Sequence, residues 1–463
     1  MAKDPVDKGL KGIASGWFER SLKTANLGRA LATEMATHRI KRAFADEAES
    51  DALDRAAKER VATLIAEQAG KLKGLAMKIG QILSYMDSGL PESARKILAT
   101  LQDSTPAMHP QVVRGLIKSE LGKYPEELFK SWNETPIAAA SIGQVHRAVT
   151  HAGEILAIKV QYPEIKEAFT SDFRNLALLG RALDMILPGK ASGIIDELKE
   201  RLAEECDYLR EMQNLDHFRS LFAGREGVRF PKTYPDYTSR RVLATEFVAG
   251  RRFAEFIASA SQQEKNRAGA TIYTLVYDAI WRHRCFNGDP HPGNYLFTDQ
   301  DVVFLDYGCV RHWQPAFIDG QRRLVHAALS GDLQRFKASA ISEGLAPRPD
   351  GLDFVKVRGT SLALMRPYLV PGEFTFTGDF VAAMTQYISR NADFLRTSMP
   401  PELTLVNRVW WGLYSVLAAM NATFEPYGIV MPLIYPQGGP YPVVPPELLH
   451  GLEFKGNLAD PSI

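Results

Sequence analysis

The chain has 463 residues, of which 45% are hydrophobic and 24% are charged, and its formal net charge is +1. This length allows two or three domains around a large core. The near-neutral charge argues against nucleic acid as a partner. Three widely separated cysteines do not form a disulfide framework, so we expect a reducing, cytoplasmic compartment. Whether the protein also associates with a membrane is left open.

The N-terminal segment, residues 1–52, begins as a basic and weakly amphipathic stretch. Residues 1–44 contain nine Lys or Arg and four Asp or Glu. Such a stretch can lie on an anionic membrane surface, and a solvated, frayed terminus is an equal alternative. The first residues lack the apolar run of a secretory signal, so we expect any membrane contact to be peripheral.

The pattern of apolar residues and turns divides the chain into five segments. A helical extension follows the basic start, and then come a lobe with a mainly antiparallel sheet, a helical lobe and an irregular Pro-rich tail. The expected ranges are, in order, 1–52, 53–135, 136–247, 248–425 and 426–463. The chain is therefore predicted to be a two-lobed α+β protein.

Hydrophobic periodicity places individual elements within these segments. Alternating apolar residues indicate strands, and apolar residues that repeat every three or four positions indicate helices. Strands are expected at 148–150, 154–161, 241–247, 295–297 and 302–305, and helices at 53–86, 110–121, 164–187, 194–222 and 268–283.

The segment that ends at Asn294 carries the first chemical pattern. Asp289 and Asn294 stand five positions apart just before a strand, as in a kinase catalytic loop. The carboxylate of Asp289 would face the nucleophile, and the amide oxygen of Asn294 is a hard ligand for Mg²⁺. Alone, this segment could be an ordinary Pro/Gly turn. Asp306 favours the kinase interpretation, because it ends the next apolar strand and lies two residues before a glycine, where a kinase has its second metal ligand.

A single Lys stands in an apolar strand at position 159. A buried ammonium needs an anion, and in a kinase nucleotide phosphates and a helical Glu supply it. A Lys on the solvent face of an edge strand is the alternative. Upstream, where a kinase has a glycine-rich loop, the sequence has Ala138, Ala139, Ala140 and Ser141. Each Cβ restricts the backbone, so we expect this loop to be stiffer and to grip phosphates differently.

Together these motifs resemble the UbiB family of atypical kinase-like proteins, which includes bacterial AarF-type and mitochondrial coenzyme-Q-biosynthesis members. The family's Lys-x-Gly-Gln motif matches Lys78 to Gln81, and its Asp-Pro-His-Pro-Gly-Asn motif matches Asp289 to Asn294. Its alanine-rich loop matches residues 138–141, and its Glu-x-Asp motif matches Glu205-Cys206-Asp207. The resemblance runs in order along most of the chain.

The resemblance implies a bilobal protein-kinase-like fold that binds ATP or ADP with Mg²⁺. Asn294 and Asp306 would be the metal ligands, and Glu211 would be the partner of Lys159. Residues 246–248 would form the hinge that hydrogen-bonds adenine through backbone groups. The groups that would hold the nucleotide belong to Ala138, Ala139, Ala140, Ser141, Lys159, Glu211, Glu246 and Val248.

The resemblance also assigns catalytic and regulatory roles. Asp289, Lys159, Lys78 and Gln81 would act in catalysis. The helical extension would fold over the site and occupy the place where a protein kinase binds its peptide. Lys78 would then approach the Glu-x-Asp carboxylates of Glu205 and Asp207, which would form a buried, regulatory charged cluster.

One departure from the family pattern is Asn287. Many members have a His at this position, two residues before the catalytic Asp. That His is largely architectural, so we expect nucleotide and metal binding to survive the exchange, whereas the role of Asp289 as a base is less secure.

Three functions follow, in decreasing order of preference. The first is an ATPase or small-molecule kinase that supports ubiquinone or other isoprenoid-quinone and lipid metabolism, with a lipid or quinone precursor as partner. The alternative is a nucleotide-switched pseudokinase that binds or extracts a lipid without phosphoryl transfer. A protein kinase is least favoured, because an extension that fills the peptide groove leaves no room for a protein substrate.

Overall fold

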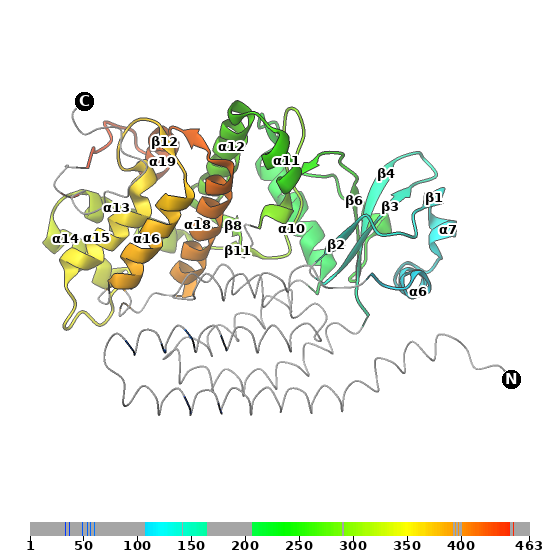
Figure 1. The fold of residues 1–463 in the computed structure, drawn as a ribbon, viewed down its shortest axis with the longest axis horizontal. Coiled ribbons are helices and arrows are strands. Elements are labelled where there is room, and N and C mark those ends of the chain that lie inside the picture. The colour runs from blue at the N-terminus through cyan, green and yellow to red at the C-terminus, as the bar shows by residue number, and fades with distance from the viewer. Residues whose placement is uncertain are drawn as a thin grey trace. The chain divides into compact units, whose positions relative to one another are not determined.

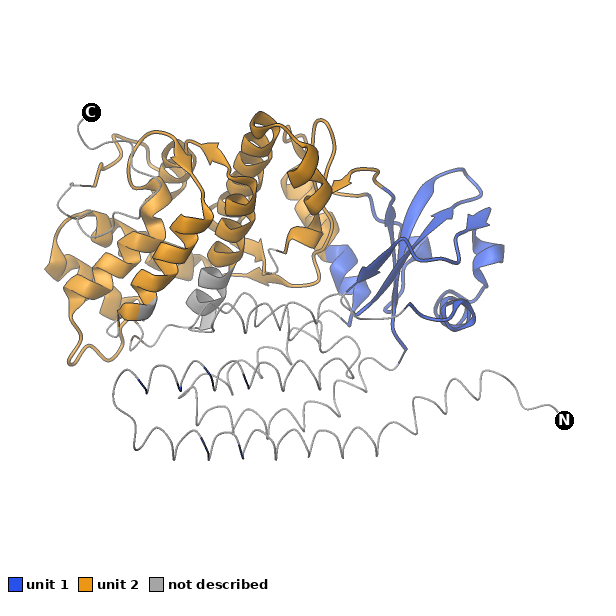
Figure 2. Cartoon of the chain, viewed as in Figure 1, with its two compact units in different colours: residues 1–213, 232–247 blue, residues 214–231, 248–463 orange. Residues whose placement is uncertain are grey.

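In the computed structural model the chain divides into two units, which Figure 2 shows in different colours. Unit 1 comprises residues 1–213 and 232–247, and unit 2 comprises residues 214–231 and 248–463. The structure describes residues 107–140, 142–163, 206–288, 291–391 and 401–444 and single positions at 33, 37, 49, 53, 56, 60, 394, 397 and 448, with the backbone alone at 389 and 401–408.

Several expected elements lie outside the described residues. These are the basic segment 1–52 and the extension as far as residue 106, apart from the single positions, and the helix expected at 164–187. The domain boundaries drawn through these segments stay predictions.

Unit 1 contains an antiparallel sheet (Figure 1). Strands β3 and β4 form its central hairpin, β6 pairs with the other edge of β4, and β1 and β2 pair with opposite ends of β3. The predicted antiparallel sheet is therefore confirmed. Its strands are β1 (Ser131–Trp132), β2 (Ala138–Ala140), β3 (Gly143–Val149), β4 (Ile155–Gln161) and β6 (Val242–Glu246).

Strand β3 is longer than the strand expected at 148–150. Its inward-facing positions include Gln144 and His146, which are 1% and 0% exposed. Polar residues on the buried face break the apolar alternation from which a strand is inferred. The sequence pattern therefore detected only the apolar end of β3.

Helix α6 (Pro110–Leu121) covers the sheet and has the predicted bounds. Pro110 opens it, and Gly122 ends it with a φ of 80°, which glycine adopts without strain. Val113, Leu116 and Ile117 form its buried face and pack in one cluster with apolar residues of β4 and β6. The short helix α7 (Pro125–Leu128) follows and leads into β1.

Helix α10 (Tyr208–Leu221) begins later than the helix expected at 194–222. Cys206 lies in a turn, and the amide of Tyr208 donates to the carbonyl of Arg240 at 3.1 Å instead of continuing a helix. The carboxylate of Asp207 accepts from the amide of Leu209 at 3.2 Å, as a capping residue does. The prediction of a continuous helix through 206–207 is therefore wrong, and residues 194–205 lie outside the described residues.

Unit 2 is mainly helical. Helix α12 carries buried residues along most of its length and contacts α18 and α19, while α13 to α16 and α18 pack as neighbours in chain order (Figure 1). Its helices are α11 (Phe253–Ser259), α12 (Gln262–Trp281), α13 (Pro315–Leu329), α14 (Leu333–Ser342), α15 (Phe354–Met365), α16 (Gly378–Arg390), α18 (Pro401–Met420) and α19 (Tyr427–Ile434), with 3-10 turns η3 (Pro292–Asn294) and η4 (Arg366–Tyr368).

Unit 2 also contains short strands, which pair with one another between its helices. One sheet has the order β5-β10-β9-β7, and two pairs, β8 with β11 and β12 with β13, stand apart from it. The strands expected at 295–297 and 302–305 are confirmed as β9 and β10. The strands are β5 (Val228–Arg229), β7 (Arg251–Arg252), β8 (Cys285–Asn287), β9 (Tyr295–Phe297), β10 (Val302–Phe304), β11 (Val310–His312), β12 (Phe374–Thr375) and β13 (Thr423–Phe424).

Two helices of unit 2 differ from the sequence prediction. Helix α12 begins at Gln262 rather than at 268, because Ser261 and Glu264 form a capping box ahead of the apolar run. Helix α19 lies in the tail that was expected to be irregular. It contains Pro432, but Val430, Met431 and Ile434 are fully buried, and this apolar packing compensates for the lost backbone hydrogen bond.

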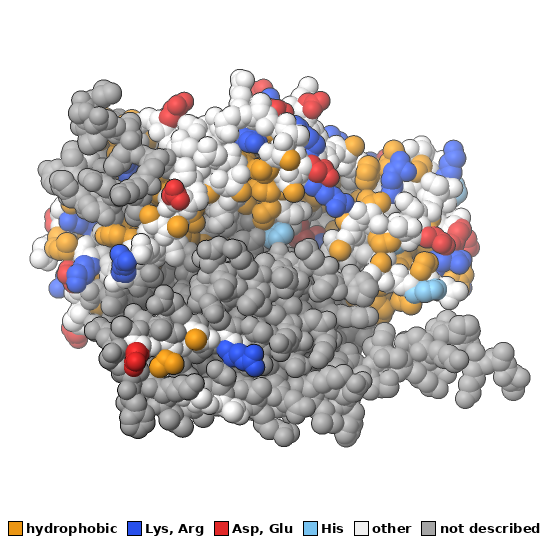
Figure 3. Space-filling model, viewed as in Figure 1, with side chains coloured by type: hydrophobic (Ala, Val, Ile, Leu, Met, Phe, Trp, Pro, Cys, Tyr) orange, Lys and Arg blue, Asp and Glu red, His pale blue; other side chains and the backbone are white. Residues whose placement is uncertain are grey.

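The described surface carries both signs of charge. On the face drawn in Figure 3, acidic and basic side chains are interspersed over the described residues, which agrees with the net charge of +1. Within the described part of the chain, none of the helices combines the length and the apolar character needed to cross a membrane.

The close packing of the β2–β3 hairpin can be tested by comparing Gly143, at the start of β3, with Gly115 in α6. A Cβ on Gly143 would lie 2.2 Å from the carbonyl oxygen of Val160, whereas a Cβ on Gly115 in α6 would meet nothing within 4 Å. Gly143→Ala should therefore lower the free energy of unfolding by about 1–3 kcal/mol. Gly115→Ala should raise it by up to about 1 kcal/mol, because alanine favours the helix. Urea unfolding followed by circular dichroism measures both, and equal effects would contradict the packing described.

Candidate functional site

A buried ion pair is the central polar feature of unit 1. The ammonium of Lys159 on β4 donates to both carboxylate oxygens of Glu211 on α10, at 2.9 and 3.1 Å. The side chain of Glu211 is 3% exposed and that of Lys159 is 15% exposed. The predicted pairing of these two residues is confirmed, and the alternative of a solvent-facing Lys on an edge strand is wrong, because β4 lies between β3 and β6.

The start of α10 positions Glu211 for this pair. Asp207 caps the helix, and its carbonyl accepts from the amide of Glu211 at 3.2 Å. The ring of Tyr208, one helical turn earlier than Glu211, lies 5.0 Å from the ammonium of Lys159 and adds a cation–π contact. Asp207 also pairs with Arg240 at 3.7 Å and is 35% exposed, so the expectation of a fully buried cluster is wrong for this carboxylate.

The alanine-rich segment forms a strand. Ala138, Ala139 and Ala140 make up β2 and pair with Val145, Gln144 and Gly143 of β3. A regular ladder engages backbone groups that a glycine-rich loop would turn toward phosphates. Ser141 at the turn lies outside the described residues, so its role as a phosphate ligand stays a prediction.

A buried hydrogen-bond chain supports this hairpin, and sequence reasoning missed it. Gln144 accepts from the amide of Met108 at 2.7 Å and its amide nitrogen lies 2.7 Å from Nε2 of His146. Nδ1 of His146 lies 2.8 Å from the carbonyl of Asn133. With Gln144 as donor, the imidazole is neutral and donates from Nδ1. The sequence signal for this chain of hydrogen bonds was the presence of two polar residues, Gln144 and His146, at alternate positions of one strand.

The metal-ligand candidates of unit 2 are held close to each other by the backbone. The amide of Leu305, just before Asp306, donates to the carbonyl of Asn294 at 3.0 Å. The carboxylate of Asp306 accepts from the amide of Gly308 at 3.0 Å. Asn294 ends the 3-10 turn η3, whose N-cap is the side chain of His291. Strands β9 and β10, which pair antiparallel, thus carry Asn294 and Asp306 at adjoining ends.

Asn287 takes part in the same arrangement. Its side-chain nitrogen donates to the main-chain carbonyl of Asp306, and it lies at the end of β8. Asn214 similarly donates to the carbonyl of Tyr307 at 2.9 Å. Asn287 and Asn214 thus hold the backbone on either side of the Asp306–Tyr307 bond.

One small cavity of unit 2 collects these side chains. Asn287, Asn294 and Asp306 line it together with Tyr307 and apolar residues of α12, and its volume is about 30 Å³. One water-sized species needs roughly 10–15 Å³ on this scale. An amide oxygen and a carboxylate around such a space fit a hard divalent cation such as Mg²⁺.

The residues predicted as the adenine hinge are partly engaged already. The amide of Glu246 donates to the carbonyl of Lys232 at 2.7 Å, and the amide of Phe247 donates to that of Ile155 at 2.9 Å. An adenine acceptor atom would therefore need another donor, such as the amide of Val248. The hinge stays a prediction.

Four further candidates lie outside the described residues. They belong to the catalytic loop, to the Lys-x-Gly-Gln motif and to the Glu-x-Asp motif, and their roles stay predictions: Asp289, Lys78, Gln81 and Glu205.

Comparisons with known sequences agree with these motifs. The ABC1 atypical kinase-like domain matches residues 100–340. The chain is 31% identical over 369 residues to the mitochondrial atypical kinase COQ8 of Saccharomyces cerevisiae, covering 78% of this chain and 73% of that protein. It is 33% identical over 274 residues to the uncharacterized protein sll1770 of Synechocystis, covering 56% of this chain. That alignment covers 45% of sll1770, so the chain spans less than half of this relative.

A solved structure also resembles the chain. The complex of Rv3197 with erythromycin, from Mycobacterium tuberculosis, aligns with a TM-score of 0.60 and 27% sequence identity. The alignment covers 84% of this chain and 98% of that chain.

The ion pair of unit 1 can be tested with a double-mutant cycle. Lys159→Met leaves the carboxylate of Glu211 buried without its cation and should lower the free energy of unfolding by about 3 kcal/mol. Adding Glu211→Leu should restore most of that loss, because an apolar pair needs no desolvated charge. As a control, Arg114→Met removes the exposed pair with Glu126 and should cost less than about 1 kcal/mol. Urea unfolding measures the cycle, and independent effects of the two substitutions would contradict a coupled pair.

His146 should make the stability of unit 1 depend on pH. Burial lowers the pKa of His146 below its ordinary value of 6.5, although the hydrogen bond to Asn133 opposes the shift. In the unfolded chain the imidazole binds a proton near pH 6.5, whereas in the folded chain it stays neutral to a lower pH. The free energy of unfolding therefore falls as the pH drops below about 6.5.

The measurement is urea unfolding between pH 5 and 8 for the native protein and for His146→Gln. The variant should lose part of the acid-side decline. Burial also lowers the pKa values of His283 and His326 in unit 2, and these residues remain in both proteins as a common background. Identical pH profiles would contradict the role given to His146.

Proposed function

Because the chain belongs to the ABC1 atypical kinase-like family, we propose that it binds Mg-ATP and either hydrolyses it or transfers a phosphoryl group to a small molecule. Membership confirms the resemblance inferred from the motifs and the kinase-like α+β fold. The observation that carries the proposal is the buried ion pair of Lys159 and Glu211.

The ion pair suits phosphate binding. Glu211 pairs with the ammonium of Lys159 and holds it in one place, and 15% of the lysine side chain still reaches solvent. A fixed cation that solvent can reach attracts the oxygens of a nucleotide phosphate. A lysine that served packing alone would not need a carboxylate that is bidentate and 3% exposed.

The residues of unit 2 fit the metal that this proposal requires. Asn294 and Asp306 would hold Mg²⁺ through their oxygen atoms, and Asn287 would keep the backbone of Asp306 in position. When bound, Mg²⁺ neutralises negative charge on the phosphates. Asp289 would orient the nucleophile, as the motif implies.

If the chain transfers a phosphoryl group, we propose that the acceptor is a small molecule. If the chain hydrolyses ATP, we propose that a molecule of the same class is the partner on which the hydrolysis acts. The relative COQ8 is named an atypical kinase, and Rv3197 is described in complex with erythromycin, a small molecule rather than a peptide. Within that class, we propose a lipid or a quinone precursor of isoprenoid-quinone metabolism, because the motifs resemble a family that includes coenzyme-Q-biosynthesis members.

The β2 strand favours a second candidate function. The three alanines belong to a regular ladder with β3, which limits how many backbone amides can wrap a triphosphate. Weak binding of the γ-phosphate suits a protein that uses nucleotide binding to change its conformation and then binds or extracts a lipid. In this second candidate ATP binds, but it is not turned over.

Nucleotide binding is tested by thermal shift with Mg-ATP, Mg-ADP and ATP in EDTA. The native protein should gain about 2.7 kcal/mol at a nucleotide concentration 100 times the Kd. Asp306→Asn should weaken Mg-ATP binding by about 10- to 100-fold, because a carboxylate ligand is lost. Asp299→Asn, the same exchange at an exposed turn, is the matched control. An unchanged Mg-ATP shift in Asp306→Asn would contradict the metal assignment.

A parallel phosphate-release assay separates the two candidates. It is run with and without anionic liposomes and a phenolic quinone-precursor mimic. Turnover that Asp306→Asn abolishes supports the enzyme, whereas a native Mg-ATP shift without turnover under any condition supports the switch.

A further inference from the structure

Three side chains of unit 2 that are able to bind a metal ion lie together, and none of them is a candidate ligand of ATP or Mg²⁺. They are His217 on α10, Cys285 on β8 and His312 on β11. Each offers one ligand atom, an imidazole nitrogen or the cysteine sulfur, and the three atoms lie within 4.8 Å of one another. In the described ranges of the chain, no second group of three His, Cys, Asp or Glu side chains is gathered in this way.

Strand register places Cys285 directly opposite His312. The next pair along the ladder is hydrogen-bonded, because the amide of Trp313 donates to the carbonyl of Arg284 at 2.8 Å. Hydrogen-bonded and non-hydrogen-bonded pairs alternate in an antiparallel ladder, so Cys285 and His312 form a non-hydrogen-bonded pair. In such a pair both side chains leave the same face, and their Cβ atoms lie about 4.5–5.5 Å apart. The backbone therefore brings the sulfur and one imidazole together.

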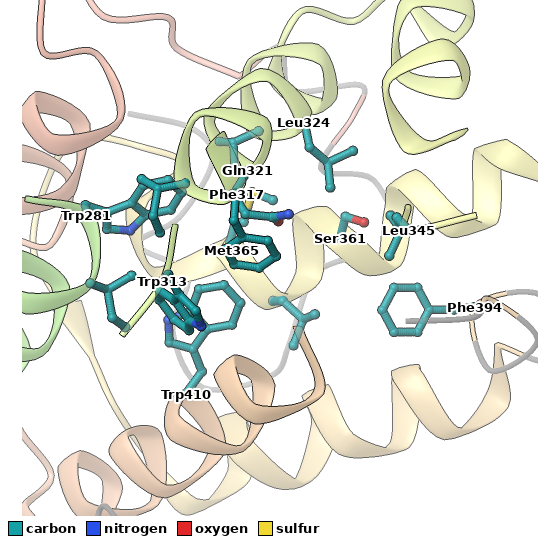
Figure 4. Close-up of a pocket in the computed structure, with 14 residues that line it drawn as sticks. Trp281, Trp313, Phe317, Gln321, Leu324, Leu345, Ser361, Met365, Phe394 and Trp410 are labelled. Atoms are coloured by element: carbon teal, nitrogen blue, oxygen red, sulfur yellow. The ribbon is translucent and has the colours of Figure 1, made fainter. Parts of the chain in front are cut away.

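The other face of this strand pair is anchored in the core. Phe286 and Trp313 leave that face, and their ring centroids lie 4.5 Å apart. Trp313 also lines an apolar cavity of about 60 Å³ among α12, α13, α15 and α18, together with Trp281 and Trp410 (Figure 4). This packing fixes the backbone that carries the two facing ligands.

Helix α10 brings the third ligand to the pair. The side chain of Asn214 donates to the carbonyl of Tyr307 at 2.9 Å, and the ring centroids of Phe218 and Tyr307 lie 4.4 Å apart. These two contacts hold the helix on either side of His217 in the sequence. The ring centroid of His217 consequently lies 5.6 Å from that of His312, with 54° between the ring planes.

The distances between the ligand atoms suit a metal ion after a small adjustment. Bonds of about 2.0–2.1 Å to nitrogen and about 2.3 Å to sulfur, at tetrahedral angles, separate ligand atoms by about 3.3–3.6 Å. The cysteine is 0% exposed, whereas both imidazoles are exposed. Rotation of the two surface rings can therefore close the site around an ion that enters from solvent, without a movement of the backbone.

The types of ligand atom decide which cation fits. Imidazole and thiolate groups bind Zn²⁺ and related transition-metal ions, whereas Mg²⁺ prefers oxygen. Burial raises the pKa of the Cys285 thiol to about 12, so at neutral pH this side chain is protonated and is not a nucleophile. A bound ion has to displace the thiol proton, which passes to solvent as the metal–sulfur bond forms. Only a cation with a strong affinity for thiolate does this.

We propose that His217, Cys285 and His312 bind one Zn²⁺ ion, with a water molecule as the fourth ligand. The ion links α10 to the pair of strands β8 and β11. Because β8 ends at Asn287, which lines the small cavity proposed for Mg²⁺, the link steadies one wall of that cavity. The Zn²⁺ site goes beyond the proposed nucleotide chemistry, and its occupancy is measured without ATP.

The first experiment titrates the full native chain, without a histidine tag and without nucleotide, with Co²⁺. This ion occupies Zn²⁺ sites, and a thiolate bound to it gives a charge-transfer absorption band that oxygen and nitrogen ligands do not give. The band should saturate at a single Co²⁺ per chain. An equal concentration of Zn²⁺ should abolish it, and a large excess of Mg²⁺ should leave it unchanged. The absence of the band, or its loss in Mg²⁺, would overturn the proposal.

Matched variants assign the ligands. Cys285→Ser should abolish the Co²⁺ band, whereas Cys309→Ser, the same exchange at another buried cysteine of unit 2, should retain it. His217→Gln and His312→Gln should each weaken Zn²⁺ binding by at least about 100-fold, because a direct ligand matters more than the groups around it. His151→Gln removes an exposed histidine of unit 1 and should bind Zn²⁺ like the native chain.

These variants can also contradict the site. Both histidine substitutions change exposed side chains, so those proteins should fold, and they decide the question if Cys285→Ser does not fold. A retained Co²⁺ band in folded Cys285→Ser, or native Zn²⁺ affinity in both histidine variants, would show that the three side chains serve packing only.

Hydrogen exchange tests the link between the elements. Saturating Zn²⁺ should slow amide exchange in β8, in β11 and in residues 214–221 of α10, and it should leave α6 of unit 1 unchanged. In His217→Gln the same Zn²⁺ concentration should leave α10 unchanged. Exchange in β8 and α10 that Zn²⁺ does not slow in the native chain, or that slows equally in α6, would overturn the link.

Discussion

The requirement that a buried charge be paired governs the architecture of unit 1. Lys159 lies on β4, between β3 and β6, and its ammonium donates to both carboxylate oxygens of Glu211. Glu211 meets it from the first turn of α10, which starts at Tyr208 after the cap provided by Asp207. The periodicity of the sequence did not indicate that α10 starts at Tyr208.

In unit 2, hydrogen bonds between neutral groups hold the candidate metal ligands in position. The amide of Leu305 binds the carbonyl of Asn294, and the side chain of Asn287 binds the carbonyl of Asp306. These bonds fix the backbone around Asn287, Asn294 and Asp306, which line one small cavity. Exchange of a His for an Asn at position 287 preserves a donor with short reach. That metal binding survives with Asn at this position stays a prediction.

Two of the cavities of unit 2 differ in chemistry. The smaller one collects oxygen donors and suits a cation. The larger one is mainly apolar, and three tryptophans contribute to its wall. Trp313, which lines the larger cavity, packs on Phe286 of β8, the strand that ends at Asn287. Both cavities thus depend on one short strand, whose placement comes from its pairing with β11.

The sequence by itself predicted the family, the candidate residues of the site and the type of most elements. Lys159, Asn294 and Asp306 were identified from residue types at fixed spacings, because phosphate and metal chemistry demands those types. Helix α6 and strands β9 and β10 were predicted closely, since their periodicity or turns are local.

Only the tertiary structure decided the features that depend on distant partners. Gln144 and His146 are buried because Met108 and Asn133 satisfy them, so β3 lacks an apolar pattern. Helix α19 forms despite Pro432 because a core surrounds it. The tryptophans of the larger cavity come from elements far apart in the chain. Burial and hydrogen-bond satisfaction are properties of the assembled fold, and local sequence carries no direct record of them.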